Sequence, residues 1–249
     1  MTTPRVFVIR HGETEWSLNG RHTGITELPL TANGEKRIRA TGRALIGDDR
    51  LIVPRNLAHI YVSPQTRPKP SNSSNIRTTA QVTITPDIRE WDYGAYEGIT
   101  STQIRSDRHA ASLPEWDIWR DGCPSGESPA EVTARCDRLI AEIRRKYHGP
   151  VMGKDPREAG PGDVLVVAHG HILRAFAMRW VGKTLQDGPT FLLEAGGVGT
   201  LSYEHRSLGS RRYFGRAFMV DVVENSVGER EGVEEGGGRG NKRGMDGVQ

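Results

Sequence analysis

The sequence predicts an α/β protein with a mostly parallel central sheet and helices on both faces. Three short runs of β-branched and apolar residues have the length and composition of buried strands, at residues 5–9, 58–62 and 164–168. Segments with helical periodicity separate these runs along the chain. Strands that alternate with helices are typical of a layered fold whose strands run in parallel.

The first strand, at residues 5–9, is followed by a helix that we expect over residues 31–46. Thr31 can cap this helix with its hydroxyl. The second strand, at residues 58–62, leads into a segment with Pro68 and Pro70, which make a regular helix improbable there. Residues 76–85 then alternate between apolar and polar side chains, which predicts a further strand.

The clearest helix start lies at Ser128, which can cap a helix while Pro129 suits the first turn and Glu131 completes a capping box. Another helix is expected to follow His171 and to end near Gly182. Late strands are expected at residues 191–194 and 198–203.

Composition and charge set the domain boundaries and exclude several classes of protein. We expect one domain over residues 1–223 and a disordered, Gly-rich charged tail over residues 224–249, because the tail has no aromatic residue and little apolar surface to bury. The chain has no dense block of Lys and Arg and no apolar run of membrane-spanning length, so neither nucleic acid nor a membrane is an expected partner. Cys123 and Cys136 match no metal motif. We expect both to be reduced, in a cytoplasmic protein, and the nucleus stays open as a second location.

Two of the predicted strands end in the same way. Residues 5–9 lead into Arg10, His11 and a glycine, and residues 164–168 lead into His169, a glycine and His171. Ligands of open α/β sheets bind beyond the carboxyl ends of the strands, so His11 and His169 are expected at a site and near each other. Taken singly, such a histidine more often caps or packs. Burial of Arg10 beside two imidazoles, however, is costly unless an anion is bound there.

The residue types at these strand ends suit phosphoryl transfer. A neutral imidazole is a nucleophile toward phosphorus, arginines can bind the phosphoryl oxygens, and a carboxylic acid can protonate the leaving group. Arg67 follows the second predicted strand and is the candidate cation. The candidate acid lies within residues 88–94, with Glu97 close behind. For any one of these residues alone, a solvated surface charge is the alternative interpretation.

Four motifs occur in the order RHGETEW, SPQTR, REW and AHGH, and together they resemble the histidine phosphatase superfamily, also called phosphoglycerate-mutase-like. The resemblance covers residues 6–206. Within the superfamily the chain is most similar to the fungal sedoheptulose-1,7-bisphosphatase branch, through stretches such as IREWDYGAYEG, WDIWRDGCPSGES and FLLEAGGVGTLSY.

The resemblance implies catalytic roles at matching positions of this chain. His11 would be the nucleophile that becomes phosphohistidine. Arg10, Arg67 and His169 would hold the transferring phosphoryl group. Glu90 would be the proton donor, for which its pKa would have to be raised.

The resemblance also implies a set of substrate contacts. His22 and Thr23 would touch the substrate from one loop, Tyr93 would line the pocket, Arg174 would meet a second phosphate, and His205 would be a further contact. Neither a metal nor a cofactor is implied, because arginines supply the positive charge.

The chain departs from the family pattern after Arg67. The family continues from this motif into a helix, whereas this chain has prolines followed by a Ser- and Asn-rich run. One helix that would flank the sheet is therefore expected to be missing.

Three functions remain open on the sequence. The first is a sugar-bisphosphate phosphatase that converts sedoheptulose 1,7-bisphosphate to sedoheptulose 7-phosphate through phosphohistidine. The second is a mutase of the phosphoglycerate type. The third is a catalytically impaired protein that binds a phosphorylated ligand, which the altered segment after Arg67 would favour. The sequence does not determine the oligomeric state.

Overall fold

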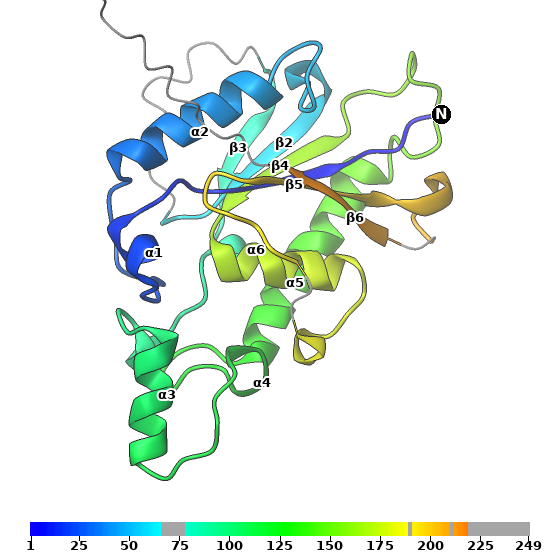
Figure 1. The fold of residues 1–249 in the computed structure, drawn as a ribbon. Helices are drawn as coiled ribbons and strands as arrows, with labels where there is room; N and C mark the ends of the chain where they lie inside the picture. Colours follow the sequence, from blue (N-terminus) through cyan, green and yellow to red (C-terminus); the bar gives the residue numbers. More distant parts are fainter. Residues whose placement is uncertain (66–77, 189–190, 210–211, 219–249) are drawn as a thin grey trace, which may run out of the picture.

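A six-stranded mixed sheet lies at the centre of the protein (Figure 1), in a computed structural model that describes residues 1–65, 78–188, 191–209 and 212–218. The strand order is β3-β2-β4-β1-β5-β6. The first four of these run in parallel, and β5 and β6 are antiparallel to their neighbours. The strands are β1 (Val6–Arg10), β2 (Leu57–Val62), β3 (Gln81–Ile84), β4 (Asp163–Ala168), β5 (Val198–Tyr203) and β6 (Arg212–Phe218).

Helices cover both faces of the sheet, which confirms the predicted fold class. On one face lies α2 (Ala32–Leu45), and on the other lie α5 (Pro129–Ile143) and α6 (Gly170–Trp180) (Figure 1). The described part of the chain also contains three shorter α-helices that the sequence analysis did not predict: α1 (Glu15–Asn19), α3 (Ser101–Ala110) and α4 (Ile118–Asp121).

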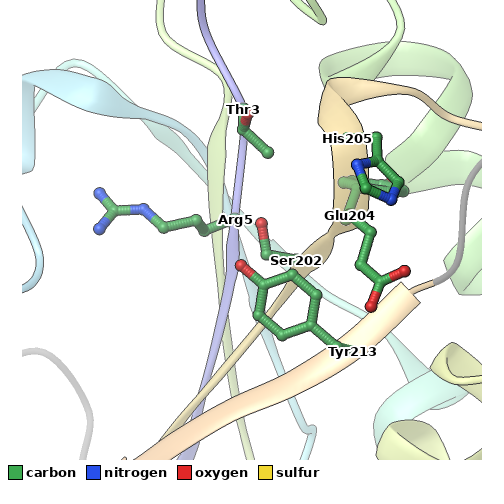
Figure 2. A pocket seen from close by; sticks show the side chains of 7 residues that line it. Thr3, Arg5, Ser202, Glu204, His205 and Tyr213 are labelled. Carbon is green, nitrogen blue, oxygen red and sulfur yellow. The ribbon is translucent and has the colours of Figure 1, made fainter.

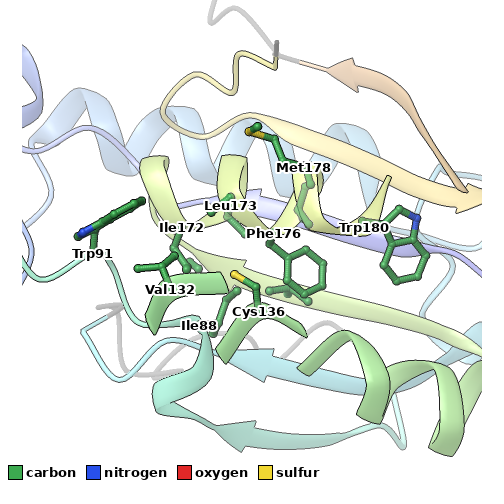
Figure 3. Packing of buried hydrophobic residues seen from close by; sticks show 14 of the residues in the cluster. Ile88, Trp91, Val132, Cys136, Ile172, Leu173, Phe176, Met178 and Trp180 are labelled. Carbon is green, nitrogen blue, oxygen red and sulfur yellow. The ribbon is translucent and has the colours of Figure 1, made fainter. Parts of the chain in front are cut away.

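Strand alternation explains how one sheet fills two cores. Along β1, Val6 and Val8 pack into the cluster beneath α5 and α6, while Phe7 faces the cluster on the α2 side. The larger cluster packs α5 and α6 against strand residues such as Val8 and Val166. Figure 3 labels these members of it: Ile88, Trp91, Val132, Cys136, Ile172, Leu173, Phe176, Met178 and Trp180.

The predicted helix starts are confirmed. The Thr31 hydroxyl accepts a hydrogen bond from the Gly34 amide at the start of α2. Ser128 and Glu131 form the complete capping box at the start of α5. The helix expected after His171 is α6, which ends at Trp180.

The strand expected over residues 191–194 is wrong. The structure has no regular element there, although β5 follows at Val198 as predicted. The backbone carbonyls of Phe191 and Leu193 instead accept hydrogen bonds from the side chains of Arg174 and Arg10. Two arginines thus take the acceptors that a neighbouring strand would need.

The strand expected over residues 76–85 is shorter than predicted. It spans only Gln81–Ile84, at the edge of the sheet, and all four of its residues are exposed. Val82 is 61% exposed and Ile84 is 68% exposed. Residues 66–77 lie outside the described residues, and with them the segment where a helix is expected to be missing, Arg67 and the start of the predicted strand. The predicted tail lies outside the described residues as well. The strand β6 was not predicted.

Within the described ranges, no helix is both long and apolar enough to cross a membrane.

The contrast between the edge strand β3 and the central strand β4 gives a testable prediction of stability. Val82→Ala should lower the free energy of unfolding by less than about 0.5 kcal/mol, because this side chain is already in contact with water. Val166→Ala, the same substitution at a fully buried position, should cost about 2–3 kcal/mol through lost burial and a cavity. Urea unfolding of both variants measures the difference, and equal losses would show that β3 is covered in solution.

Candidate active site

The pairing of β1 with β4 brings the two predicted histidines together. Arg10 and Ala168 are partners in the parallel register, so the residues that follow them leave the sheet side by side. The His11 amide donates to the Ala168 carbonyl at 3.0 Å. The His11 and His169 rings meet edge to face, with centroids 4.8 Å apart.

The His11 ring is held as a neutral imidazole whose Nε2 has no hydrogen-bond partner in the described part of the chain. Its Nδ1 lies 2.7 Å from the Gly12 carbonyl oxygen, and because a carbonyl can only accept, Nδ1 carries the proton. Burial, the neighbouring His169 and Arg10 lower the pKa of His11 to about 4, although the bond to Gly12 opposes this shift. The lone pair on Nε2 is therefore available for nucleophilic attack near neutral pH.

His169 ends β4 and stands at the N-cap of α6. Its Nε2 lies 2.8 Å from the hydroxyl of Ser63, which is only 1% exposed, and that hydroxyl donates to the Gln65 side-chain carbonyl at 3.0 Å. Burial and the nearby Arg10 lower the pKa of His169 to about 4. Ser63 was not among the predicted site residues, although it opens the motif that contains Arg67.

Arg10 is half-buried, and its guanidinium has donors that the described residues leave unused. One terminal nitrogen donates to the Leu193 carbonyl at 2.9 Å, while the buried Nε has no hydrogen-bond partner among the described residues. Gly170 packs against this guanidinium, because a Cβ at that position would lie 3.3 Å from the Arg10 Cζ. The glycine after His169 thus makes room for a cation.

Arg174 is a second half-buried cation near Arg10. Its Nε donates to the Phe191 carbonyl at 3.1 Å, and its Cζ lies 5.2 Å from the centre of the Trp119 ring. Burial and the charge of Arg10 lower the pKa of Arg174. Among the described residues, no carboxylate lies within ion-pair distance of either Arg10 or Arg174.

Arg135 is a buried arginine of the same protein whose charge is fully paired, and it serves as a comparison for Arg10 and Arg174. It pairs with both carboxylate oxygens of Glu127, at 3.0 and 2.9 Å, and donates to three backbone carbonyls. Arg135 has a carboxylate partner, whereas Arg10 and Arg174 have none among the described residues. This difference sets the site of Arg10 and Arg174 apart.

Glu90 lies at the start of α6, beside the two histidines. Its buried carboxylate accepts backbone hydrogen bonds from Trp91 at 2.9 Å, Ile172 at 2.8 Å and His171 at 3.1 Å. The first turn of α6 thus holds the predicted acid in place with its free amide groups.

A cavity of about 380 Å³ opens next to this cluster, and His22 lines it. The His22 ring lies 4.7 Å from that of Tyr93, whose hydroxyl is 2.8 Å from His171 Nδ1. Thr23, in the same loop as His22, is not in the cavity wall. The wall is formed by His22, Ser101, Arg105, Glu115, Trp116, Asp117, Ile118, Trp119, Arg120 and His171.

Sequence reasoning did not select Trp119 or His171 as site residues. The WDIW and AHGH motifs that contain them were its only signals.

The structure does not bring His205 to this site. β5 runs antiparallel to β1, so its end at Tyr203 lies beside the beginning of β1. His205 therefore lines a different cavity of about 600 Å³, with Thr3 and Arg5 (Figure 2). The predicted substrate contact at His205 is at odds with this placement, because the active-site histidines are at the opposite end of β1.

The described residues contain no group of three or more His, Cys, Asp or Glu side chains that could hold a metal ion. The expectation that neither a metal nor a cofactor takes part stays a prediction.

Residues 6–214 match the family model described as "Histidine phosphatase superfamily (branch 1)". The chain is 34% identical to sedoheptulose 1,7-bisphosphatase of Saccharomyces cerevisiae, over 83% of this chain and 90% of that protein. It is 37% identical to an acid phosphatase of Mycobacterium tuberculosis, over 81% of this chain and 87% of that protein. The solved structure of the open reading frame Rv3214 from Mycobacterium tuberculosis superposes with a TM-score of 0.66 at 34% identity, covering 86% of this chain and 96% of that chain.

The lowered pKa values predict that stability depends on pH. In the folded protein the pKa of His11 and of His169 is about 4, whereas the ordinary pKa of a histidine, which applies in the unfolded chain, is 6.5. The unfolded chain therefore binds protons more readily than the folded protein. Their contribution is complete above pH 6.5 and is lost as the pH falls toward 4. The free energy of unfolding should therefore drop from pH 7 to pH 5, by roughly 1–2 kcal/mol for each histidine.

Urea unfolding at the two pH values measures this drop. His11→Asn keeps a donor near the Gly12 carbonyl but cannot titrate, so its drop should be smaller than that of the parent. His109→Asn changes an exposed histidine and is the control. An unchanged drop in His11→Asn would contradict the prediction.

Proposed function

The chain belongs to branch 1 of the histidine phosphatase superfamily, and on that premise we propose that it hydrolyses a sugar-bisphosphate monoester through a phosphohistidine at His11. The observation that carries the proposal is the pair of half-buried cations, Arg10 and Arg174, which lack a carboxylate partner in the described structure. Two such guanidiniums repel each other, and a bound anion with several oxygens removes that cost.

The first half of the reaction transfers the phosphoryl group to the protein. His11 Nε2 attacks phosphorus while the bond from phosphorus to the ester oxygen breaks. Arg10, Arg67 and His169 hold the other phosphoryl oxygens, and Glu90 gives its proton to the leaving alkoxide. The products of this half are the free alcohol and phosphohistidine.

The second half reverses the role of Glu90. Its carboxylate takes a proton from water, the hydroxide attacks phosphorus, and the bond from phosphorus to His11 Nε2 breaks. Inorganic phosphate leaves and His11 returns to its neutral form. The positive charge for both halves comes from the protein, so the proposed reaction needs no metal.

Sedoheptulose 1,7-bisphosphate is the first substrate to test, because a sedoheptulose 1,7-bisphosphatase is among the relatives at 34% identity. The cavity beside His22 can receive the sugar chain, and Arg174 would meet the second phosphate. Tyr93 supports this cavity through His171, with Thr23 nearby in the loop. Both cysteines are free and buried, which supports a reducing compartment such as the cytoplasm.

A direct assay tests the proposed function. The parent protein should release phosphate from sedoheptulose 1,7-bisphosphate in the presence of a chelator, and His11→Ala should lower that rate by roughly a thousandfold or more. A His11→Ala variant that keeps most of the activity would show that His11 is not the nucleophile. Isomerised product without free phosphate would identify a mutase. A folded parent that binds vanadate without turnover would identify a binding protein.

The role of Glu90 is tested by changing the leaving group. Glu90→Gln should slow sugar-phosphate hydrolysis by roughly 10²–10⁴-fold, since an alkoxide leaves poorly without a proton. An activated aryl phosphate leaves without that help, so its hydrolysis should fall much less. Steady-state rates on both substrates measure the contrast, and equal losses would exclude Glu90 as the acid.

A further inference from the structure

We propose that Glu97 is a positioning residue that shapes the loop of residues 21–26 and thereby sets the affinity of the active site for the substrate's leaving group. The inference rests on the proposed function, because it assigns His22 of this loop to the cavity that receives the leaving group.

The Glu97 carboxylate binds three successive backbone amides of the loop. Oε1 accepts from Gly24 at 3.1 Å, from Ile25 at 3.2 Å and from Thr26 at 3.0 Å. Oε2 accepts from Gly24 at 2.9 Å. Successive amides that point to one spot form an anion-binding concavity, and here a side chain of the same protein occupies it.

No arginine or lysine of the described structure forms an ion pair with Glu97. The negative charge of this half-buried carboxylate is therefore balanced by the loop amides. The same hydrogen bonds thus fix both the Glu97 side chain and the loop backbone.

The start of the same loop is fixed to the chain that follows Glu97. The His22 amide donates to the Ile99 carbonyl at 3.0 Å, and the Gly98 amide donates to the His22 carbonyl at 2.8 Å. Arg21 and Thr100 form an isolated antiparallel bridge one step further. The backbone of His22 is thus enclosed between a short ladder on one side and the Glu97 carboxylate on the other.

This enclosure directs the His22 ring into the active-site cavity. The ring is buried, its Nε2 lies 3.1 Å from the Ser101 hydroxyl, and its centroid lies 5.8 Å from that of His171. Both of these neighbours line the cavity. A shift of the loop would therefore move a wall of the site without touching His11 or His169.

Apolar packing does not fix the far end of the loop, since Ile25 is 62% exposed. Close approach does constrain Gly24, where a Cβ would lie 2.4 Å from the Trp91 carbonyl oxygen and 3.0 Å from Glu97 Oε2. Loss of the carboxylate should consequently release the loop while the two cores stay intact.

The test separates substrate affinity from the rate of chemistry. Glu97→Gln should raise KM for sedoheptulose 1,7-bisphosphate about tenfold and leave kcat within about threefold, because the loop must be ordered at the moment of binding. Gly24→Ala keeps the carboxylate but pushes the loop away from it, so it should show the same pattern. Amide hydrogen exchange of residues 24–26 should accelerate in Glu97→Gln.

Glu131→Gln is the matched control, since Glu131 also accepts a backbone amide, that of Ser128, at the exposed start of α5. It should leave KM and kcat unchanged. A fall in kcat with an unchanged KM, or an equal rise of KM in Glu131→Gln, would overturn the proposal. Slow exchange at residues 24–26 in Glu97→Gln would also overturn it. A parent without phosphatase activity would refute the proposed function instead, and the exchange measurement would still report on Glu97.

Discussion

The parallel pairing of β1 with β4 is the constraint on which the rest of the site depends. Because Arg10 and Ala168 are partners in this register, His11 and His169 leave the sheet together at the same edge. A shift of the register by one residue would turn one of the two rings to the opposite face. The apolar alternation that buries β1 between two cores therefore also sets the distance between the catalytic candidates.

The amino end of α6 organises the charges around this pair. His169 stands at its N-cap, Gly170 leaves room for the Arg10 guanidinium, and the next amides hold the Glu90 carboxylate. A helix start favours negative charge, so it can fix an acid and attract a phosphoryl group at once. Arg174, from the next turn, adds a second cation. One helix end thus gathers the candidate acid, His169 and two cations, and no carboxylate of the described residues pairs with Arg10 or Arg174.

Residues 191–194 bind arginine side chains of the candidate site and form no regular secondary structure. The carbonyls of Phe191 and Leu193 bind arginine side chains, so the segment forms no strand although its composition favours one. In the loop of residues 21–26, the amides of Gly24, Ile25 and Thr26 likewise bind a side chain, the Glu97 carboxylate. In both segments, side chains near the site form hydrogen bonds with backbone groups that would otherwise be available to a strand or helix.

The sequence by itself determined the fold class, the parallel strands at the centre and the starts of α2, α5 and α6, because strand composition and helix caps are local signals. It also predicted that His11 and His169 lie near each other, since motifs at the carboxyl ends of parallel strands converge, whereas Glu90 came from the resemblance of its motif to the family. Only the tertiary structure showed that Ser63 contacts His169, that Trp119 lines the cavity and that Glu97 binds the loop amides. It also showed that His205 lies away from the two histidines. The direction of β5 relative to β1 and the partner of a carboxylate depend on contacts between distant segments, and no local pattern encodes them.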